Sequence, residues 1–244
     1  MNTLTGAGTG PNGYPFRIEG RLEEPVSRWL WLVKWLLLIP HYVVLWFLFV
    51  AMVVLTVIAF FAVLFTGRYP RGIFDFNLGV VRWAWRVGFY GYSALGTDRY
   101  PPFSFDAVAE YPATLDVRYP THLPRGLALV GWWLRGLPQY IIVAVLAGGT
   151  VIAAHFGGVI SVLAVVAGLL VLVTATYPRG FFDFVMGLNR WVFRVLTYAL
   201  LMCEEYPPFR FDPGGPDAPP VPSTDPAPMR PDAPATLLPH PPAI

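Results

Sequence analysis

Two long apolar stretches dominate the chain, and each is followed by a segment in which polar residues recur at helical spacing. The stretches run from Trp29 to Thr66 and from Leu127 to Thr176. As one helix the first would be about 57 Å long, against a bilayer hydrocarbon core of about 30 Å. We therefore expect it to fold back as a hairpin. The open alternative is an interfacial first part, followed by a single crossing made by residues 42–66.

The expected hairpin turns lie around Phe49–Val53 and Ala154–Gly158, where the sequence has no Lys or Arg. The second turn contains Gly157-Gly158, a pair typical of turns. Basic residues flank the apolar stretches instead. Under the positive-inside rule, the termini and charged flanks then lie in the cytoplasm and the turns face out. We predict a multi-pass protein of a bacterial cytoplasmic (inner) membrane with four crossings, two being the alternative.

The chain is a tandem repeat. Tyr69-Pro-Arg-Gly-Ile-Phe-Asp-Phe76 returns as Tyr177-Pro-Arg-Gly-Phe-Phe-Asp-Phe184, and the closing Tyr100-Pro-Pro-Phe103 returns as Tyr206-Pro-Pro-Phe209. We divide the chain into a flexible N-terminus (1–13), repeats at 14–106 and 111–212, and a Pro-rich disordered tail (213–244). The predicted fold is an all-α integral membrane protein. Each repeat would be an apolar helical hairpin followed by an amphipathic interfacial helix.

A polar stripe recurs after each Tyr-Pro-Arg-Gly motif, in steps of four, three, four and four that place its members on one helical face. Its residues are Asp75, Gly79, Arg82, Arg86 and Tyr90, matched by Asp183, Gly187, Arg190, Arg194 and Tyr198. In one interpretation arginines bind a lipid phosphate or acidic partner groups, because guanidinium binds such anions bidentately. The candidate contacts are Arg71, Arg82, Arg86, Arg179, Arg190 and Arg194. In the other, the stripe only faces the headgroups or pairs with acidic residues of its own chain.

Other repeated residues suit structural roles. We expect Tyr69-Pro70 and Tyr177-Pro178 to end the apolar helix. Asp75 and Asp183 are then expected in the first turn of the next helix, where a carboxylate is favourable. The prolines at Pro101, Pro102, Pro207 and Pro208 fix an extended backbone, which flanking aromatic residues can dock back as a clamp.

Composition agrees with a membrane protein: 55% of the residues are hydrophobic and 13% are charged, about half the usual charged share. A net charge of +2 without a basic cluster argues against nucleic acid. The single cysteine, Cys203, excludes an internal disulfide. His41 aligns with Gln139, so that position requires no ionisable group. No catalytic motif or metal-ligand cluster is visible, so we expect neither an enzyme nor a cofactor or metal.

The motifs resemble those of a bacterial membrane family catalogued as domain of unknown function 4389. The motifs of that family are matched at Tyr69–Phe76, Arg82-Trp83, Arg86-Val87 and Tyr100–Phe103, and again at Tyr177–Phe184, Arg190-Trp191, Arg194-Val195 and Tyr206–Phe209. The resemblance implies an integral membrane protein and carries over no activity.

The sequence is therefore compatible with three functions. The first is a non-enzymatic accessory or scaffold that binds membrane lipids or a membrane protein complex through its basic interfacial helices. The second is a transporter or channel for a lipid or small amphiphile. The third is a lipid-modifying enzyme, for which Asp75 and Asp183 are the only repeated candidates. Oligomeric state stays open.

Overall fold

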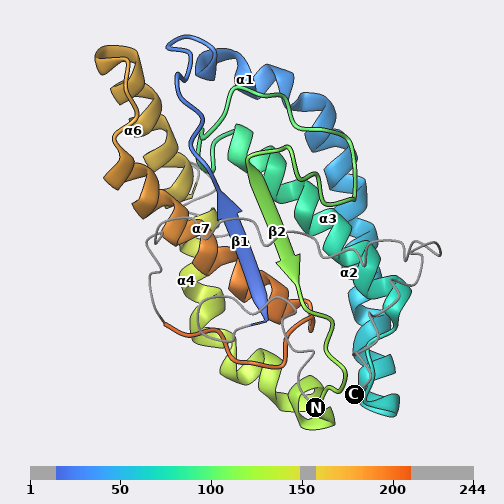
Figure 1. The fold of residues 1–244 in the computed structure, drawn as a ribbon. Helices are drawn as coiled ribbons and strands as arrows, with labels where there is room; N and C mark the ends of the chain where they lie inside the picture. Colours follow the sequence, from blue (N-terminus) through green and yellow to red (C-terminus); the bar gives the residue numbers. More distant parts are fainter. Residues whose placement is uncertain (1–14, 149–157, 210–244) are drawn as a thin grey trace, which may run out of the picture. The chain divides into compact units, whose positions relative to one another are not determined.

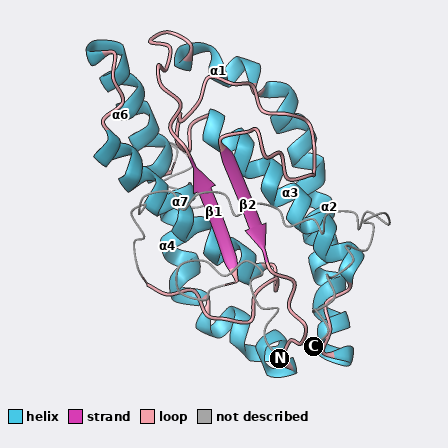
Figure 2. Ribbon diagram, viewed as in Figure 1, coloured by secondary structure: helices cyan, strands magenta, loops and turns pink. Residues whose placement is uncertain are grey.

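The computed structural model of the protein describes residues 15–148 and 158–209, which lie in the first of two compact units, Met1–Gly214. The second unit, Gly215–Ile244, lies outside the described residues, as do residues 1–13 and nearly all of the turn expected at Ala154–Gly158. The described part is mostly helical, and a two-stranded ribbon lies across two of its helices (Figures 1 and 2).

The ribbon joins the openings of the two repeats. Strand β1 (Phe16–Gly20) pairs antiparallel with β2 (Ala113–Val117). Ile18 lies opposite Leu115, its counterpart in the other repeat, so the pairing has a local two-fold pseudosymmetry. Alternate residues are buried, as expected of a strand covered on one face. The all-α prediction is thus wrong for these ten residues: strands of five residues carry too little alternation to be recognised, and each pairs only with the other repeat.

Repeat one contains α1 (Trp31–Leu37), α2 (Ile39–Thr66) and α3 (Arg71–Tyr90). The turn predicted within Phe49–Val53 is wrong, because α2 passes through it without a break. No glycine or proline lies there to interrupt the helix. The chain reverses instead at Gly67, and α3 packs antiparallel along α2 (Figure 1). The second limb of the hairpin is therefore the amphipathic helix.

Repeat two follows the same plan with its long helix interrupted. Its elements are η1, a π-helix (Leu127–Arg135), α4 (Leu137–Ala147), α6 (Val159–Thr174) and α7 (Arg179–Ala199). Residue Gly158 lies against the last turn of α4: a Cβ there would lie 2.3 Å from the Leu146 carbonyl oxygen. Both α4 and α6 pack on α7, as α2 packs on α3 (Figure 1). The turn of the apolar hairpin predicted here lies almost wholly outside the described residues, and α7 is the limb that returns after α6.

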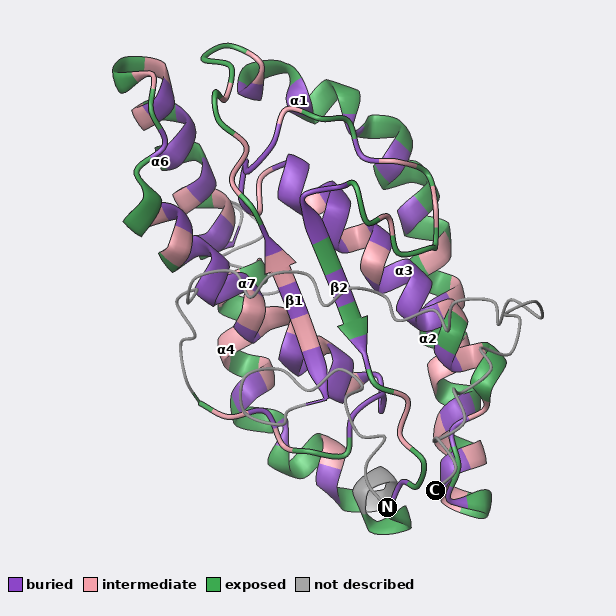
Figure 3. Cartoon of the chain, viewed as in Figure 1, coloured by how far each residue is buried: buried purple, intermediate pink, exposed green. Residues whose placement is uncertain are grey.

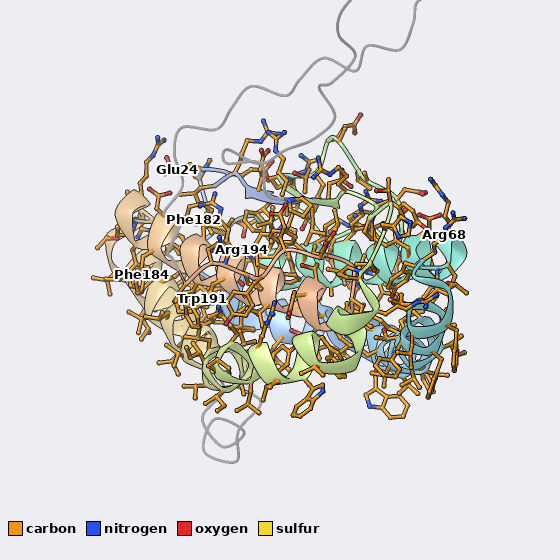
Figure 4. All side chains as sticks on the ribbon, turned by 90° about the horizontal axis from the view of Figure 1, so that it is seen from below. Glu24, Arg68, Phe182, Phe184, Trp191 and Arg194 are labelled. Carbon is orange, nitrogen blue, oxygen red and sulfur yellow. The ribbon has the colours of Figure 1, made fainter. Side chains whose placement is uncertain are left out.

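The elements form layers. The ribbon lies over α3 and α7, and α1, α2, η1, α4 and α6 lie on the other side of those two helices (Figure 4). The middle helices are largely buried, whereas α2 exposes most of its surface (Figure 3). Between the repeats the core is aromatic, with Trp85 packed on Phe193 at 5.2 Å between ring centroids. Trp31 likewise meets α6 at Gly168, where a Cβ would lie 2.7 Å from the indole.

Candidate functional site

The polar stripe of α3 faces the protein's own chain. The Nε of Arg82 donates to the Leu115 carbonyl at 3.0 Å, and its Nη2 pairs with the Asp116 carboxylate. Both acceptors belong to β2, the strand of the other repeat. Nearby, Gly79 admits Phe105: a Cβ on that glycine would lie 2.7 Å from the Cβ of Phe105. Gly79 and Arg82 are thus covered by β2 and by the segment that follows the Pro-Pro motif, whereas Asp75, the first residue of the stripe, is exposed.

Arg86, another member of this stripe, is also buried, with 2% of its surface exposed. Its Nη1 donates to the Asp106 carbonyl at 2.9 Å, and its Nη2 donates to the Ser104 carbonyl. Burial lowers the pKa of the Arg86 guanidinium. In repeat two, Arg194 is also buried and Arg190 is half-buried. The structure therefore places both arginines in intramolecular contacts, Arg82 with a carboxylate of β2 and Arg86 with two backbone carbonyls.

Two of the other candidate arginines are exposed. Arg71 and Arg179 occupy the first position of α3 and α7. Arg71 stacks on the Tyr119 ring, 4.3 Å from its centroid, and Arg179 has 83% of its side chain exposed, with Glu24 at 4.0 Å. Because the helices begin at these arginines, Asp75 is the fifth residue of α3 and no acidic residue lies in the first turn of either helix. The first-turn prediction for Asp75 and Asp183 is therefore wrong, because each aspartate lies just past the first turn.

The Tyr-Pro motifs supply the caps and the links between repeats. Pro70 and Pro178 are the N-caps of α3 and α7. Each preceding tyrosine reaches the other repeat: the hydroxyl of Tyr69 donates to the Leu200 carbonyl at 3.2 Å, and that of Tyr177 donates to the Ala94 carbonyl at 2.9 Å. Burial raises the pKa of Tyr69 to about 12. Both phenols therefore stay protonated near neutral pH, as hydrogen-bond donors must.

The equivalence of His41 and Gln139 has a structural basis. The indole Nε1 of Trp83 donates to His41 Nδ1 at 3.0 Å, and that of Trp191 donates to Gln139 Oε1 at 2.6 Å. Either side chain can supply the acceptor, so no ionisable group is needed. Phe103 of the Pro-Pro motif stacks on His41 at 3.9 Å between centroids. The segments after Pro101-Pro102 and Pro207-Pro208 thus dock beside the start of the long apolar helix in each repeat.

A buried cation was missed by the sequence analysis. Lys34 in α1 is fully buried, and its Nζ lies 3.0 Å from the Asp98 carboxylate and 4.6 Å from the centroid of the Tyr90 ring. The same Nζ donates to the Thr97 carbonyl at 2.6 Å. The sequence does contain a signal for this pair: Lys34 lies within an apolar stretch, and Asp98 lies just before the Pro-Pro motif. The pair holds α1 to the end of α3 and is confined to repeat one, since η1 has no lysine.

A surface cavity of about 350 Å³ lies where the linker between the repeats meets the end of α7. His122, Glu204 and Glu205 line it together with Cys203, whose thiol is buried. Burial raises the pKa of the Cys203 thiol to about 12, so it is a poor nucleophile at neutral pH. Within residues 15–148 and 158–209, no three His, Cys, Asp or Glu side chains lie close enough together to hold a metal ion.

The largest unpartnered surface is apolar. In the described part of the chain, α2 alone is long and apolar enough to cross a membrane, and only 17% of its most apolar window is buried. Its buried positions form one seam against α3, at His41, Leu45, Met52, Ala59 and Val63. Its exposed positions include Val43, Trp46, Phe47, Val50, Val57 and Phe65. Apolar side chains of η1, α4 and α6 are exposed as well, and the polar side chains gather on the ribbon side (Figure 4).

These features are those of a known family. The model of the family described as domain of unknown function DUF4389 matches the chain twice, at residues 28–104 and 131–210, which together exceed half of the chain. The chain belongs to this family and carries two tandem copies of its domain. No curated protein and no solved structure matches the chain.

Proposed function

We propose that the chain is a non-enzymatic accessory or scaffold protein of a bacterial cytoplasmic membrane, which holds anionic lipid or an acidic partner complex beside the bilayer. The observation that carries the proposal is the separation of its two faces (Figure 4). The helices α2, α4 and α6 contain no Lys, Arg, Asp or Glu, and they expose many large apolar side chains. Such a surface is far more extensive than soluble monomers expose.

The basic contact in this proposal is the pair of helix starts, Arg71 and Arg179. Both are exposed, both follow directly on the end of a long apolar helix, and both recur at the same place in the repeat. Arg68, exposed beside Arg71, lies on the ribbon side of the apolar layer (Figure 4). A guanidinium just beyond the apolar layer would lie at the level of the lipid phosphates when that layer is in the bilayer. The buried arginines Arg86 and Arg194 then act as supports of the fold.

A transporter is supported less well. The seam between the repeats is filled by aromatic side chains, with Trp85 against Phe193 and Phe89 against Phe182 at 6.1 Å between centroids. A path for an amphiphile through this seam would require these rings to move apart. The one exposed cavity described above lies at the linker, outside this aromatic seam.

Mass spectrometry of the protein in native-membrane polymer nanodiscs tests the proposal. We expect the wild-type protein to retain a stoichiometric partner or several-fold enriched anionic lipid, and Arg71→Gln with Arg179→Gln to lose most of it. The matched control is Arg17→Gln with Arg21→Gln, which removes the same charge from the ribbon and its end. Wild-type discs with bulk lipid composition and no partner would contradict the scaffold function.

A further inference from the structure

Helices α2 and α3 pack against each other, and this packing limits how α2 can lie relative to a membrane. The two helices are in contact from the start of α2 to its middle, and the turn at Gly67 joins their other ends. Near one end, a Cβ on Gly91 would lie 2.5 Å from the side chain of Leu38. In the middle, the Asn77 amide donates to Thr56 Oγ1 at 3.2 Å. Most of the length of α2 therefore lies beside α3.

The polar ribbon lies at the levels of this shared length, because it rests on α3. Arg82 of α3 is tied to Asp116 of β2, whose side chain is 65% exposed. Asp75 is exposed on α3 itself. If α2 crossed a bilayer, both carboxylates would be carried into the hydrocarbon beside its central turns. Charged groups at that depth are costly unless they face a water-filled cavity or a partner inside the protein.

The exposed part of α2 has a different chemistry all along its length. Only one seam of the helix is buried, and the remaining surface is apolar from Tyr42 to Phe65. Exposed tryptophans lie towards its start, at Trp29, Trp35 and Trp46. The layer continues into η1, where Phe60 of α2 meets Trp132 at 6.3 Å between centroids. At the other end, Trp31 meets α6 at Gly168.

We propose that α2, together with α4 and α6, lies parallel to the membrane plane within a single leaflet and does not cross the bilayer. The proposal rests on the membrane attachment proposed above. The apolar layer is one helix thick, about 10 Å, which fits within one leaflet of a hydrocarbon core about 30 Å thick. The middle layer of α3 and α7 then lies at the headgroups, and the ribbon faces water. This is the geometry of an interfacial helix with its apolar face immersed.

A lipid leaflet suits this surface better than a second copy of the chain. The exposed arc of α2 reaches round both sides of its seam, with Tyr42 and Phe49 on one side and Val44 and Ile58 on the other, so one partner helix would cover only part of it. Acyl chains can cover the arc from below and from both sides. The exposed Arg68 and Arg71 just past the end of α2 match anionic headgroups in charge.

Spin labels at three positions of α2 test the orientation. Val43, Val50 and Val57 are about half exposed and are spaced by seven residues, so they lie on one helical face. Each is changed to cysteine in a Cys203→Ser background, labelled with a nitroxide, and reconstituted in vesicles of phosphatidylcholine and phosphatidylglycerol. Collisions with oxygen and with a water-soluble nickel chelate give the depth of each label. We expect three similar depths, all within the acyl chains.

A crossing helix would give depths that change by about 10 Å from each label to the next, and this would overturn the in-plane arrangement while leaving membrane attachment intact. Labels open to the nickel chelate at all three sites would overturn the attachment itself. Immobile labels reached by neither quencher would show a second copy covering the surface. As a second measurement, Ser27→Cys and Arg68→Cys are treated with an impermeant maleimide in oriented vesicles. The in-plane helix labels both sites from the same side.

Discussion

The hydroxyl of Tyr177 in the second repeat donates a hydrogen bond of 2.9 Å to the carbonyl of Ala94 in the first. The reverse link, from Tyr69 to Leu200, is present at the equivalent place. Both tyrosines open the Tyr-Pro-Arg-Gly motif, and both acceptors lie in the turn just after an amphipathic helix. The most recognisable motif of the sequence thus joins one copy of the domain to the other.

We expect Tyr177→Phe to lower the free energy of unfolding by about 1 kcal/mol, because a buried carbonyl loses its donor. Tyr69→Phe should cost more, about 1–3 kcal/mol, since the Asn77 amide also donates to that hydroxyl at 3.0 Å. Unfolding by SDS titration in mixed micelles measures both. Tyr100→Phe is the control, because its partly exposed hydroxyl leaves the Leu37 carbonyl nearer to solvent. Equal losses in all three variants would contradict a special role for the links.

The ends of the two long apolar helices offer a stabilising substitution. Gly67 caps α2 with φ +71°, and Ala175 caps α6 with φ +60° at the equivalent position. A left-handed conformation is strained for alanine and free for glycine. We expect Ala175→Gly to raise the free energy of unfolding by about 0.5–1 kcal/mol.

The reciprocal variant, Gly67→Ala, should lower the free energy of unfolding by a similar amount. A Cβ at Gly67 would meet no atom closer than 3.7 Å, so the loss reports the backbone alone. The same SDS titration measures both variants. No change in either would show that the two caps relax away from the left-handed conformation at little cost.

The sequence predicts the residues that recur better than it predicts how they are used. The helices bearing Arg82 and Arg190 lie where the four- and three-residue steps place them, and the His41–Gln139 equivalence is explained by one tryptophan in each repeat. The direction in which the stripe faces could not be derived, because a helical face covered by its own chain and one facing headgroups share the same periodicity. Only the register of β2 over α3 brings Asp116 to Arg82.

The apolar stretches illustrate a second limit. Length and hydropathy alone favoured a fold-back of α2 on itself, whereas its reversing partner is α3, which carries charges. The seam that decides this, with Leu45, Met52 and Ala59, is as apolar as the surface around it. A helix facing lipid and a helix packed along one edge therefore read alike in the sequence. Repeat two is ten residues longer than repeat one between the His41/Gln139 position and the Tyr-Pro-Arg-Gly motif, and this longer stretch contains a glycine-rich turn signal that repeat one lacks.

The thiol of Cys203 should be almost unreactive in the folded protein. It is 1% exposed, and with its pKa raised to about 12 by burial, about one thiol in ten thousand is ionised at pH 8. We expect negligible maleimide labelling of the native protein over minutes and complete labelling after unfolding in SDS. Ser27→Cys, at an exposed position, should label at once as the control. Rapid labelling of Cys203 would mean that the segment after α7 opens readily.

Arg86 should behave as a structural residue and Arg71 as a surface one. Arg86→Lys keeps the charge but loses the fork that reaches both the Ser104 and the Asp106 carbonyls, so we expect a loss of about 1.5–3 kcal/mol in the free energy of unfolding. Arg71→Lys, on the surface, should change it by less than about 0.5 kcal/mol. Thermal unfolding in detergent, followed by circular dichroism, separates the two. Equal stability of both variants would mean that the buried guanidinium is not needed to hold the clamp.

Gly79 is the point at which the clamp closes on α3, and its replacement should show whether that closure is tight. A Cβ at Gly79 would lie 2.7 Å from the Cβ of Phe105, so Gly79→Ala should force the segment outward and cost about 1–3 kcal/mol in the free energy of unfolding. Gly72, in the first turn of the same helix, has no atom within 4 Å of the added carbon. Gly72→Ala should therefore be neutral or stabilising by up to about 1 kcal/mol, because alanine favours the helix.

The difference between the two variants, measured by thermal unfolding in detergent, removes the effect of helix propensity and reports the clamp contact. Phe105→Ala added to Gly79→Ala should recover little of that loss, because alanine keeps the Cβ that the added methyl group would meet. If Gly79→Ala is as stable as Gly72→Ala, the segment after Pro101-Pro102 rests only loosely on α3 at this point.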